Sequence, residues 1–191
     1  YSNIGFGILG YSLSRVSGIP FMELVDASIV QPLGMGSTTF VVTPSIAEQL
    51  ATGYVARRDG SVDAETPYRE HIGRGYKVPN GGVYSTVGDM ARFVAGLTGA
   101  ASAPILGPEG RRLIRTSQTP EDGAQYSFGF SISQREGAPD LIGHGGSVAG
   151  YNAHFVFEPE SRIGVILFRN YGGGSTNLGS VARDLLWRLV G

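Results

Sequence analysis

The sequence predicts an α+β fold, in which an antiparallel sheet is flanked by helices and joined to part of a helical lobe. Three observations lead to this prediction. Apolar residues recur at helical spacing near the start of the chain and again after residue 86. From about residue 125 they alternate with a period of two, as in strands, and the last residues return to a helical period. We therefore expect residues 1–120 to form part of the helical lobe and residues 121–191 to form the sheet with its closing helix.

The first residues predict two helices in succession. The first helix starts beside Ser2 or Asn3, either of which can cap it, and stops at Gly18. Pro20 suits the first turn of the second helix, and Pro32 ends that helix. The apolar stripes of the two helices are Phe6, Leu9, Leu13 and Val16, then Phe21, Leu24, Val25 and Ile29.

Residues 44–80 have the weakest periodicity in the chain. Residues 53–55 suit a short strand, and the Arg-Arg-Asp-Gly stretch at 57–60 is a hairpin-turn signal. Residues 71–79 are polar and rich in glycine, which predicts a long surface loop. Beyond this loop, Thr86 and Asp89 form a capping box for a helix with a buried stripe. Another short helix is predicted to begin at Pro108.

Four later segments predict the sheet. Residues 126–133 alternate like one strand, with Phe128, Phe130 and Ile132 on one face. Residues 141–145 and 151–158 suit two further strands. Residues 163–168 are nearly continuously apolar, which predicts a central strand that is covered on both sides. Glycines at 172–174 end this strand, and an amphipathic helix closes the chain.

Composition and charge narrow the classes of function. Of the 191 residues, 41% are hydrophobic and 16% are charged, which is typical of a folded protein rather than a disordered one. The net charge of −1 provides no basic surface for a nucleic-acid partner. The absence of cysteine excludes disulfides and thiolate metal sites. No apolar run reaches the length of about 20 residues that spans a bilayer.

The His-Gly-Gly-Ser stretch at residues 144–147 is the first candidate for a functional site. It lies just before two segments that are predicted to pair as strands. Because Gly145 and Gly146 have no side chains, a ligand can lie directly against the backbone, and amide N–H groups can point at a substrate oxygen. The alternative interpretation of His144 is a hydrogen-bonded strand histidine without a chemical role.

Several motifs occur together in one order along the chain. They are Tyr-Ser-Asn at 1–3, Ile-Val-Gln-Pro-Leu-Gly-Met at 29–35, Gly-Gly-Val-Tyr-Ser-Thr at 81–86 with Asp-Met-Ala-Arg-Phe at 89–93, Tyr-Ser-Phe-Gly-Phe at 126–130, and His-Gly-Gly at 144–146. In this order the chain resembles the class C β-lactamase-like serine hydrolases, which include β-lactamases, DD-peptidases, D-aminopeptidases and carboxylesterases. The resemblance implies the α+β fold of that family and a substrate that is an ester, an amide or a D-peptide.

This family has three catalytic motifs, and the sequence matches two of them. Tyr1 to Asn3 matches Tyr-x-Asn, and His144 to Gly146 matches Lys/His-x-Gly. The Ser-x-x-Lys motif is missing, because Lys77 is the only lysine and Arg74 stands three residues before it. The resemblance therefore implies an incomplete fold, the C-terminal part of an enzyme whose nucleophile lies upstream or on a complementing chain. We expect the 191 residues alone to be inactive, and to be poorly soluble without that partner.

The resemblance also implies a role for each matched residue. Tyr1 would be the general base or proton shuttle, and Asn3 would hold the substrate carbonyl and orient the lysine. His144 would support the proton transfer of the tyrosine, and it resembles the DD-peptidase, aminopeptidase and esterase branches rather than the lactamases with lysine. Gly145 and Gly146 would let the acyl group lie along the strand, and the Ser147 N–H would be one oxyanion-hole donor.

Simpler interpretations of these residues remain open at this point. Tyr1 could be an aromatic residue packed on the first helix, and Asn3 could be a helix cap. His71 and His154 do not cluster with a carboxylate at metal-ligand spacing, so we expect no metal and no cofactor, and a structural role for His154. A second hypothesis for the whole chain is a non-catalytic module of the same fold that binds a ligand or a partner protein.

Overall fold

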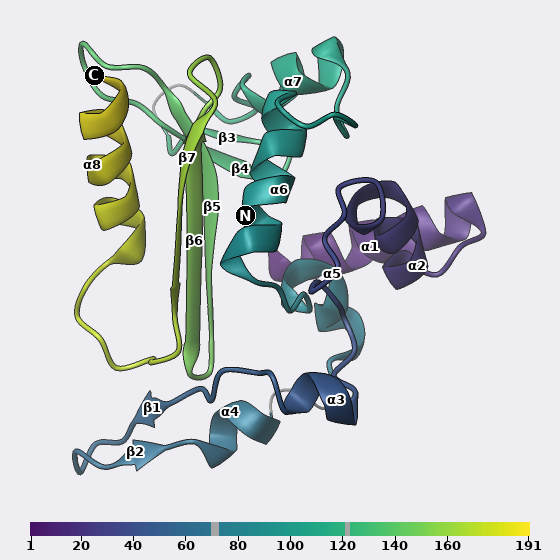
Figure 1. Ribbon diagram of the computed structural model, residues 1–191, viewed down its shortest axis with the longest axis vertical. Helices are drawn as coiled ribbons and strands as arrows, with labels where there is room; N and C mark the ends of the chain where they lie inside the picture. The colour runs from purple at the N-terminus through teal and green to yellow at the C-terminus, as the bar shows by residue number, and fades with distance from the viewer. Residues whose placement is uncertain (70–72, 121–122) are drawn as a thin grey trace.

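The computed structural model describes residues 1–69, 73–120 and 123–191. A five-stranded antiparallel sheet stands between helix α8 on one face and helix α6 on the other, and the N-terminal helices lie beyond α6 (Figure 1). This arrangement confirms the predicted α+β class. The predicted division into residues 1–120 and 121–191 stays a prediction.

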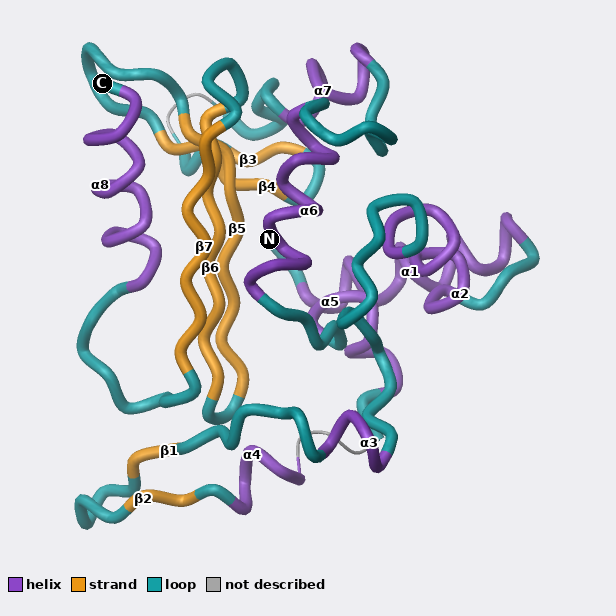
Figure 2. The backbone as a smooth tube through the Cα atoms, in the orientation of Figure 1, coloured by secondary structure: helices purple, strands orange, loops and turns teal. Residues whose placement is uncertain are grey.

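The sheet has the strand order β3-β4-β5-β6-β7, so each strand pairs with the next one in the chain. Its strands are β3 (Tyr126–Ser127), β4 (Phe130–Ser133), β5 (Leu141–Val148), β6 (Tyr151–Glu158) and β7 (Ile163–Arg169). Figure 2 shows β5, β6 and β7 side by side as three long strands, with β3 and β4 short beside their upper ends. In the register of β5 against β6, His144 lies opposite Phe155.

The prediction of one continuous strand over residues 126–133 is wrong. A turn at Phe128 and Gly129 divides the segment into β3 and β4, which pair with each other. Gly129 has a φ of 94°, which residues with a side chain rarely adopt. Phe128 lies at the tip of this hairpin and is 60% exposed, so it does not share an inner face with Phe130. The alternation of apolar residues continues through the turn and hides it.

The prediction of a central position for residues 163–168 is also wrong. Among the described strands, β7 is at the edge of the sheet and pairs only with β6. The predicted cover on both faces is correct, because Ile166 packs with the cluster under α6 while Val165 and Leu167 pack with α8. A continuously apolar strand therefore indicates that both of its faces are covered, but it does not indicate how many strands pair with it.

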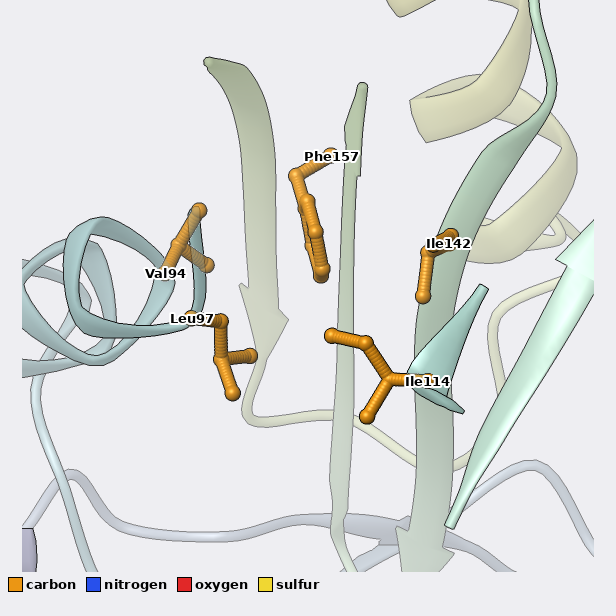
Figure 3. Packing of buried hydrophobic residues seen from close by; sticks show 5 residues of the cluster. All are labelled: Val94, Leu97, Ile114, Ile142 and Phe157. Atoms are coloured by element: carbon orange, nitrogen blue, oxygen red, sulfur yellow. The ribbon is translucent and has the colours of Figure 1, made fainter. Parts of the chain in front are cut away.

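Two hydrophobic layers hold the helices to the sheet. Helix α6 (Val87–Thr98) and helix α7 (Pro108–Ile114) cover one face, and helix α8 (Leu178–Val190) covers the other. Successive residues of the strands alternate between the layers. The first layer contains Val94, Leu97, Ile114, Ile142 and Phe157 (Figure 3), and the second contains Leu141, Val156, Val165, Ala182 and Leu186.

The start of α6 is tied to the segment before it through Asp89. The Asp89 N–H donates to Thr86 Oγ1 at 3.1 Å, so the predicted cap is confirmed. The buried Asp89 carboxylate does not complete a capping box, because it accepts hydrogen bonds from elsewhere. Its donors are the Ser37 N–H at 2.8 Å, the Thr38 hydroxyl at 2.9 Å and the Arg92 guanidinium at 3.0 Å. This carboxylate fixes the chain around residue 38 against α6.

The N-terminal helices pack around α1 (Asn3–Ser17), which ends at Gly18 as predicted, with a φ of 71°. Helix α2 (Phe21–Val25) continues into a π-helical turn, η1 (Asp26–Val30). Helix α5 (Val78–Gly81) lies against α1, where a Cβ on Gly10 would be 2.4 Å from the Pro79 ring. This close approach requires glycine at position 10.

The prediction of a surface loop at 71–79 is correct for residues 73 and 74, which form no helix or strand, and wrong for residues 75–79. Residues Gly75–Lys77 form a 3₁₀ turn, η2, which leads directly into α5. Pro79 is compatible with this start because proline fits the first turn of a helix. Residues 71 and 72 lie outside the described residues.

A small hairpin lies below the sheet in Figure 1. Helix α3 (Pro44–Ala47) leads to β1 (Val55–Ala56) and β2 (Val62–Asp63), followed by helix α4 (Glu65–Arg69). The predicted turn at residues 57–60 is confirmed, with Gly60 at a φ of 85°. The Tyr151 hydroxyl donates to the Ala51 carbonyl at 2.9 Å, which joins this region to the end of β6.

Apolar side chains are exposed on α1, β7 and α8. They are Ile4, Ile8, Leu9, Leu13 and Val16 on α1, Ile163 and Phe168 on β7, and Val181, Leu185 and Leu189 on α8. The expected poor solubility of the isolated chain stays a prediction. In the part of the chain that the structure describes, no helix combines the length and the apolar character that crossing a membrane requires.

Replacing Phe157 in the first layer should destabilise the protein strongly, whereas replacing Phe128 at the hairpin tip should change its stability little. Phe157 is fully buried, so Phe157→Ala should lower the free energy of unfolding by about 3–5 kcal/mol. Phe128→Ala removes the same atoms from an exposed turn and should change it by about 0.5 kcal/mol or less. Urea unfolding of both variants measures the difference. Equal losses would contradict the placement of the two rings.

Candidate active site

Tyr1 and Asn3 are joined at the start of α1. The Gly5 N–H donates to Ser2 Oγ at 3.1 Å, so Ser2 and not Asn3 caps the helix. The Asn3 side chain is thereby left to accept a hydrogen bond from the Tyr1 hydroxyl at 2.7 Å. Asn80 donates to the Asn3 carbonyl at 3.0 Å and ties this end of α1 to α5. The cap and the proposed site therefore use different side chains.

The structure brings His144 to Tyr1. His144 lies in the middle of β5, and its ring centroid is 5.6 Å from that of Tyr1. Burial lowers the pKa of the His144 imidazole, and a hydrogen bond with the Gly145 backbone opposes this shift in part. The ring is therefore neutral at pH 7 and can both donate and accept a hydrogen bond.

The strand that carries His144 has a free edge next to that residue. The pairing of β5 with β4 covers Leu141 to Gly143, whereas its pairing with β6 continues to Val148. Among the described strands, none pairs with residues 144–148 on the β4 side. Gly145, Gly146 and Ser147 lie on this free edge and are exposed. An extended ligand can therefore add to β5 where β4 ends.

Gly145 and Gly146 meet different surroundings. A Cβ on Gly145 would lie 2.4 Å from the Nδ1 of His154, on the face that α8 covers. A Cβ on Gly146 would have no atom within 4 Å. Since alternate residues of a strand share a face, Gly146 lies on the same face as His144. Gly145 is needed for packing, and Gly146 leaves open space beside the histidine.

His154 lies on the opposite face of the sheet from Tyr1, as its predicted structural role requires. Its pKa is lowered by burial first, then by the charge of Arg183, and then by the repulsion that a protonated His144 would exert. In the ranges 1–69, 73–120 and 123–191, no group of three or more His, Asp or Glu is arranged to hold a metal ion. His71 lies outside the described residues. The expectation of no metal and no cofactor stays an expectation.

Tyr126 is a site residue that the sequence reasoning missed. Its ring centroid is 6.1 Å from that of Tyr1 and 6.1 Å from that of His144. Burial raises the pKa of the Tyr126 phenol, and the nearby Tyr1 adds to the shift. Its alternating neighbours indicate only a strand, although Tyr126 begins one of the motifs that carry the family resemblance. The motif at residues 126–130 is the sequence signal from which a role for Tyr126 at the site could have been predicted.

The comparison with known families shows to which family the chain belongs. A family model described as Beta-lactamase matches residues 1–185. The chain belongs to the beta-lactamase family. The resemblance inferred from five weak motifs is thus confirmed.

Individual members of the beta-lactamase family align with nearly the whole chain. It is 27% identical over 205 residues to the D-alanyl-D-alanine-carboxypeptidase/endopeptidase AmpH of Escherichia coli strain K12, covering 100% of this chain and 50% of that protein. A penicillin-binding protein from Bacillus halodurans is 27% identical, with a TM-score of 0.77, over 97% of this chain and 56% of that one. A D-amino acid amidase from Ochrobactrum anthropi SV3 shares the fold, with a TM-score of 0.78 at 23% identity over 99% and 57% of the two chains.

These matches have two consequences. The chain spans about half the length of the curated relative from Escherichia coli. The names of the Escherichia coli relative and of the amidase are those of hydrolytic enzymes. The roles of Tyr1, Asn3 and His144 in this chain are a matter for proposal.

The two glycines of the site provide a matched pair of substitutions. Gly145→Ala should destabilise the protein by about 1–3 kcal/mol, because the new methyl group pushes against the His154 ring. Gly146→Ala should change stability by about 0.5 kcal/mol or less, because its methyl group enters open space. Thermal unfolding of the two variants measures the difference. A larger loss for Gly146→Ala would contradict the register of β5.

Proposed function

We propose that this chain is the C-terminal part of a serine hydrolase that acts through an acyl-enzyme on ester, amide or peptide bonds. The observation that carries the proposal is the contact of Tyr1 and His144, whose rings lie 5.6 Å apart beside the free edge of β5. A proton-transferring pair and an open strand edge are the two parts that acyl transfer requires of this region. The serine and lysine of Ser-x-x-Lys would come from an upstream or complementing segment.

Tyr1 has the role of proton carrier in this proposal. With Tyr1 in its phenolate form, the serine oxygen bonds to the substrate carbonyl carbon and the serine proton passes to the Tyr1 oxygen, which becomes a neutral phenol, while the carbonyl oxygen takes the negative charge. The same proton then goes to the leaving amine or alcohol as its bond to the carbonyl carbon breaks. Water next attacks the acyl-enzyme by the same route, its proton passing through Tyr1 to the released serine oxygen. Asn3 holds the Tyr1 hydroxyl at 2.7 Å and so fixes its direction.

The strand β5 has the role of binding the acyl group. The acyl group would lie along Gly145 and Gly146, where no side chain stands in its way on the His144 face. The Ser147 N–H, together with the N–H of the nucleophile, would donate to the oxygen that becomes negatively charged. The neutral His144 would accept or donate a hydrogen bond beside Tyr1 without adding a fixed charge.

The names of the relatives support a substrate class that contains D-amino acids. The Escherichia coli relative is named a D-alanyl-D-alanine carboxypeptidase and endopeptidase, and the amidase of like fold was studied with D-phenylalanine. His144 stands where lactamases of class C have lysine, and by resemblance this favours peptidase, aminopeptidase or esterase activity. Amides and esters of D-amino acids are therefore the first substrates to test.

A second candidate is a non-catalytic module that binds an extended peptide at the free edge of β5. A full-length sequence in which Ser-x-x-Lys is absent or altered would favour this candidate. It predicts binding of a D-peptide without turnover. The two candidates differ in one property, the formation of a covalent adduct on a serine.

Covalent labelling tests the proposal directly. The chain should be produced together with its Ser-x-x-Lys segment and treated with a fluorophosphonate and with penicillin. Mass spectrometry should find one adduct on the serine of that segment, and D-amino-acid amides or nitrophenyl esters should be hydrolysed. Tyr1→Phe should lower kcat by about 10²- to 10⁴-fold, the usual contribution of general acid–base catalysis. Tyr11→Phe, a change of an exposed tyrosine on α1, is the matched control and should retain full activity.

Two outcomes would count against this assignment. Bound D-peptide with neither adduct nor hydrolysis would favour the binding module. Full activity of Tyr1→Phe would remove the tyrosine from the mechanism.

A further inference from the structure

Tyr126 has a buried hydroxyl with nothing to bind. Its oxygen is almost completely removed from solvent, and no described residue forms a hydrogen bond with it. Folded proteins pair nearly all buried polar groups, because an unpaired one has lost its hydrogen bonds to water without replacement. Such an unpaired group at a proposed active site suggests a partner that is engaged in another state of the protein.

The surroundings of this hydroxyl restrict what that partner can be. The Tyr126 ring packs edge-on against Tyr1, at an interplanar angle of 69°, and against His144, at 73°. Among the described residues, the titratable rings in contact with the Tyr1 ring are Tyr126 from β3, at 6.1 Å between centroids, and His144 from β5, at 5.6 Å. Helix α1 contributes Phe6, at 5.4 Å between ring centroids, and Asn3, neither of which titrates.

Tyr126 has a hydrogen-bond donor that is not used, and Tyr1 has an acceptor that is not used. The Tyr1 hydroxyl donates to Asn3 and accepts a hydrogen bond from none of the described residues. A phenol oxygen can accept as well as donate, so the Tyr1 oxygen keeps free acceptor positions. The Tyr126 phenol stays protonated, because burial and the nearby Tyr1 raise its pKa, and its O–H is a free donor. The two rings already lie edge to face, with 6.1 Å between their centroids.

Resting on the function proposed above, we propose that Tyr126 is a positioning residue for Tyr1 and donates its O–H to the Tyr1 oxygen when Tyr1 exchanges its proton. Until it takes up the serine proton, Tyr1 carries the negative charge of its phenolate. A hydrogen bond to the charged form of an acid favours that form. The Tyr126 hydroxyl would thereby make Tyr1 a usable base near neutral pH, a task for which the neutral His144 supplies no positive charge.

The variant Tyr126→Phe tests this role, because it removes only the hydroxyl and keeps the ring contacts. In the complete enzyme, kcat/KM should fall about 10- to 100-fold, the range for loss of a hydrogen bond to a charged group. The KM for a small ester should change little. The acidic limb of the pH–rate profile should move to higher pH by about one unit or more, since Tyr1 loses the donor that favours its phenolate.

Titration of Tyr1 itself provides a second measurement that does not depend on turnover. With carbon-13 at the Cζ of tyrosine, NMR should show a higher pKa for Tyr1 in Tyr126→Phe than in the wild type. Tyr11→Phe is the control for both measurements and should leave the profile unchanged. A merely structural role of Tyr126 would lower the melting temperature and leave the acidic limb and the Tyr1 pKa in place, which would overturn the proposal.

Two results separate the role of Tyr126 from the proposed hydrolase function. A wild-type enzyme that forms no fluorophosphonate adduct would overturn both. A wild-type enzyme that forms the adduct, combined with an unshifted Tyr126→Phe profile, would overturn the role of Tyr126 alone.

Discussion

The register of β5 against β6 is the constraint on which the rest of the site depends. A shift by one residue would turn His144 to the α8 face and bring a glycine to the face of Tyr1. Two glycines of β5 allow the close packing of this register, because a side chain at either position would clash. A Cβ at Gly143 would be 2.3 Å from the Phe155 carbonyl oxygen, and one at Gly145 would be 2.4 Å from the His154 ring. The buried Leu141 and Ile142, on opposite faces, fix the same register from the upper end of the strand.

The other half of the site depends on how α1 is held. Glycines let α1 approach the segment after residue 75, since a Cβ on Gly7 would be 2.9 Å from the Tyr76 carbonyl oxygen. Asn80 then binds the Asn3 carbonyl, and the chain continues from there into α6 on the sheet. Tyr1 therefore reaches His144 through the packing of α5 and α6, although the two residues are far apart in the sequence.

The features that depend on residues close together in the sequence could be predicted from it. Gly18 ends α1, Thr86 caps α6, and alternating apolar residues mark β6, each through a preference that acts within a few residues. The turn at Phe128 and Gly129 could not, because an alternating pattern also runs through a tight hairpin. The edge position of β7 could not be predicted either, because an apolar run indicates covered faces and not the order of the strands.

The same distinction applies to the site. Tyr1, Asn3 and His144 were found from motifs, and the structure places them together. The competition between capping and the site at Asn3 could not be resolved from sequence, because Ser2 and Asn3 are both good caps. Tyr126 was missed because the role proposed for it depends on one unpaired hydroxyl, and hydrogen-bond pairing appears only in three dimensions.

The central claim is that Tyr1, His144 and the free edge of β5 form one acyl-transfer site. A crystal structure of the complete protein after reaction with a phosphonate tests it most directly. The account predicts a phosphonyl group bound to the serine of Ser-x-x-Lys, with its oxygen accepting from the Ser147 N–H and its chain lying along Gly145 and Gly146. The Tyr1 hydroxyl should face the group. A phosphonyl group away from β5, with the edge at residues 144–148 covered by another part of the protein, would contradict the claim.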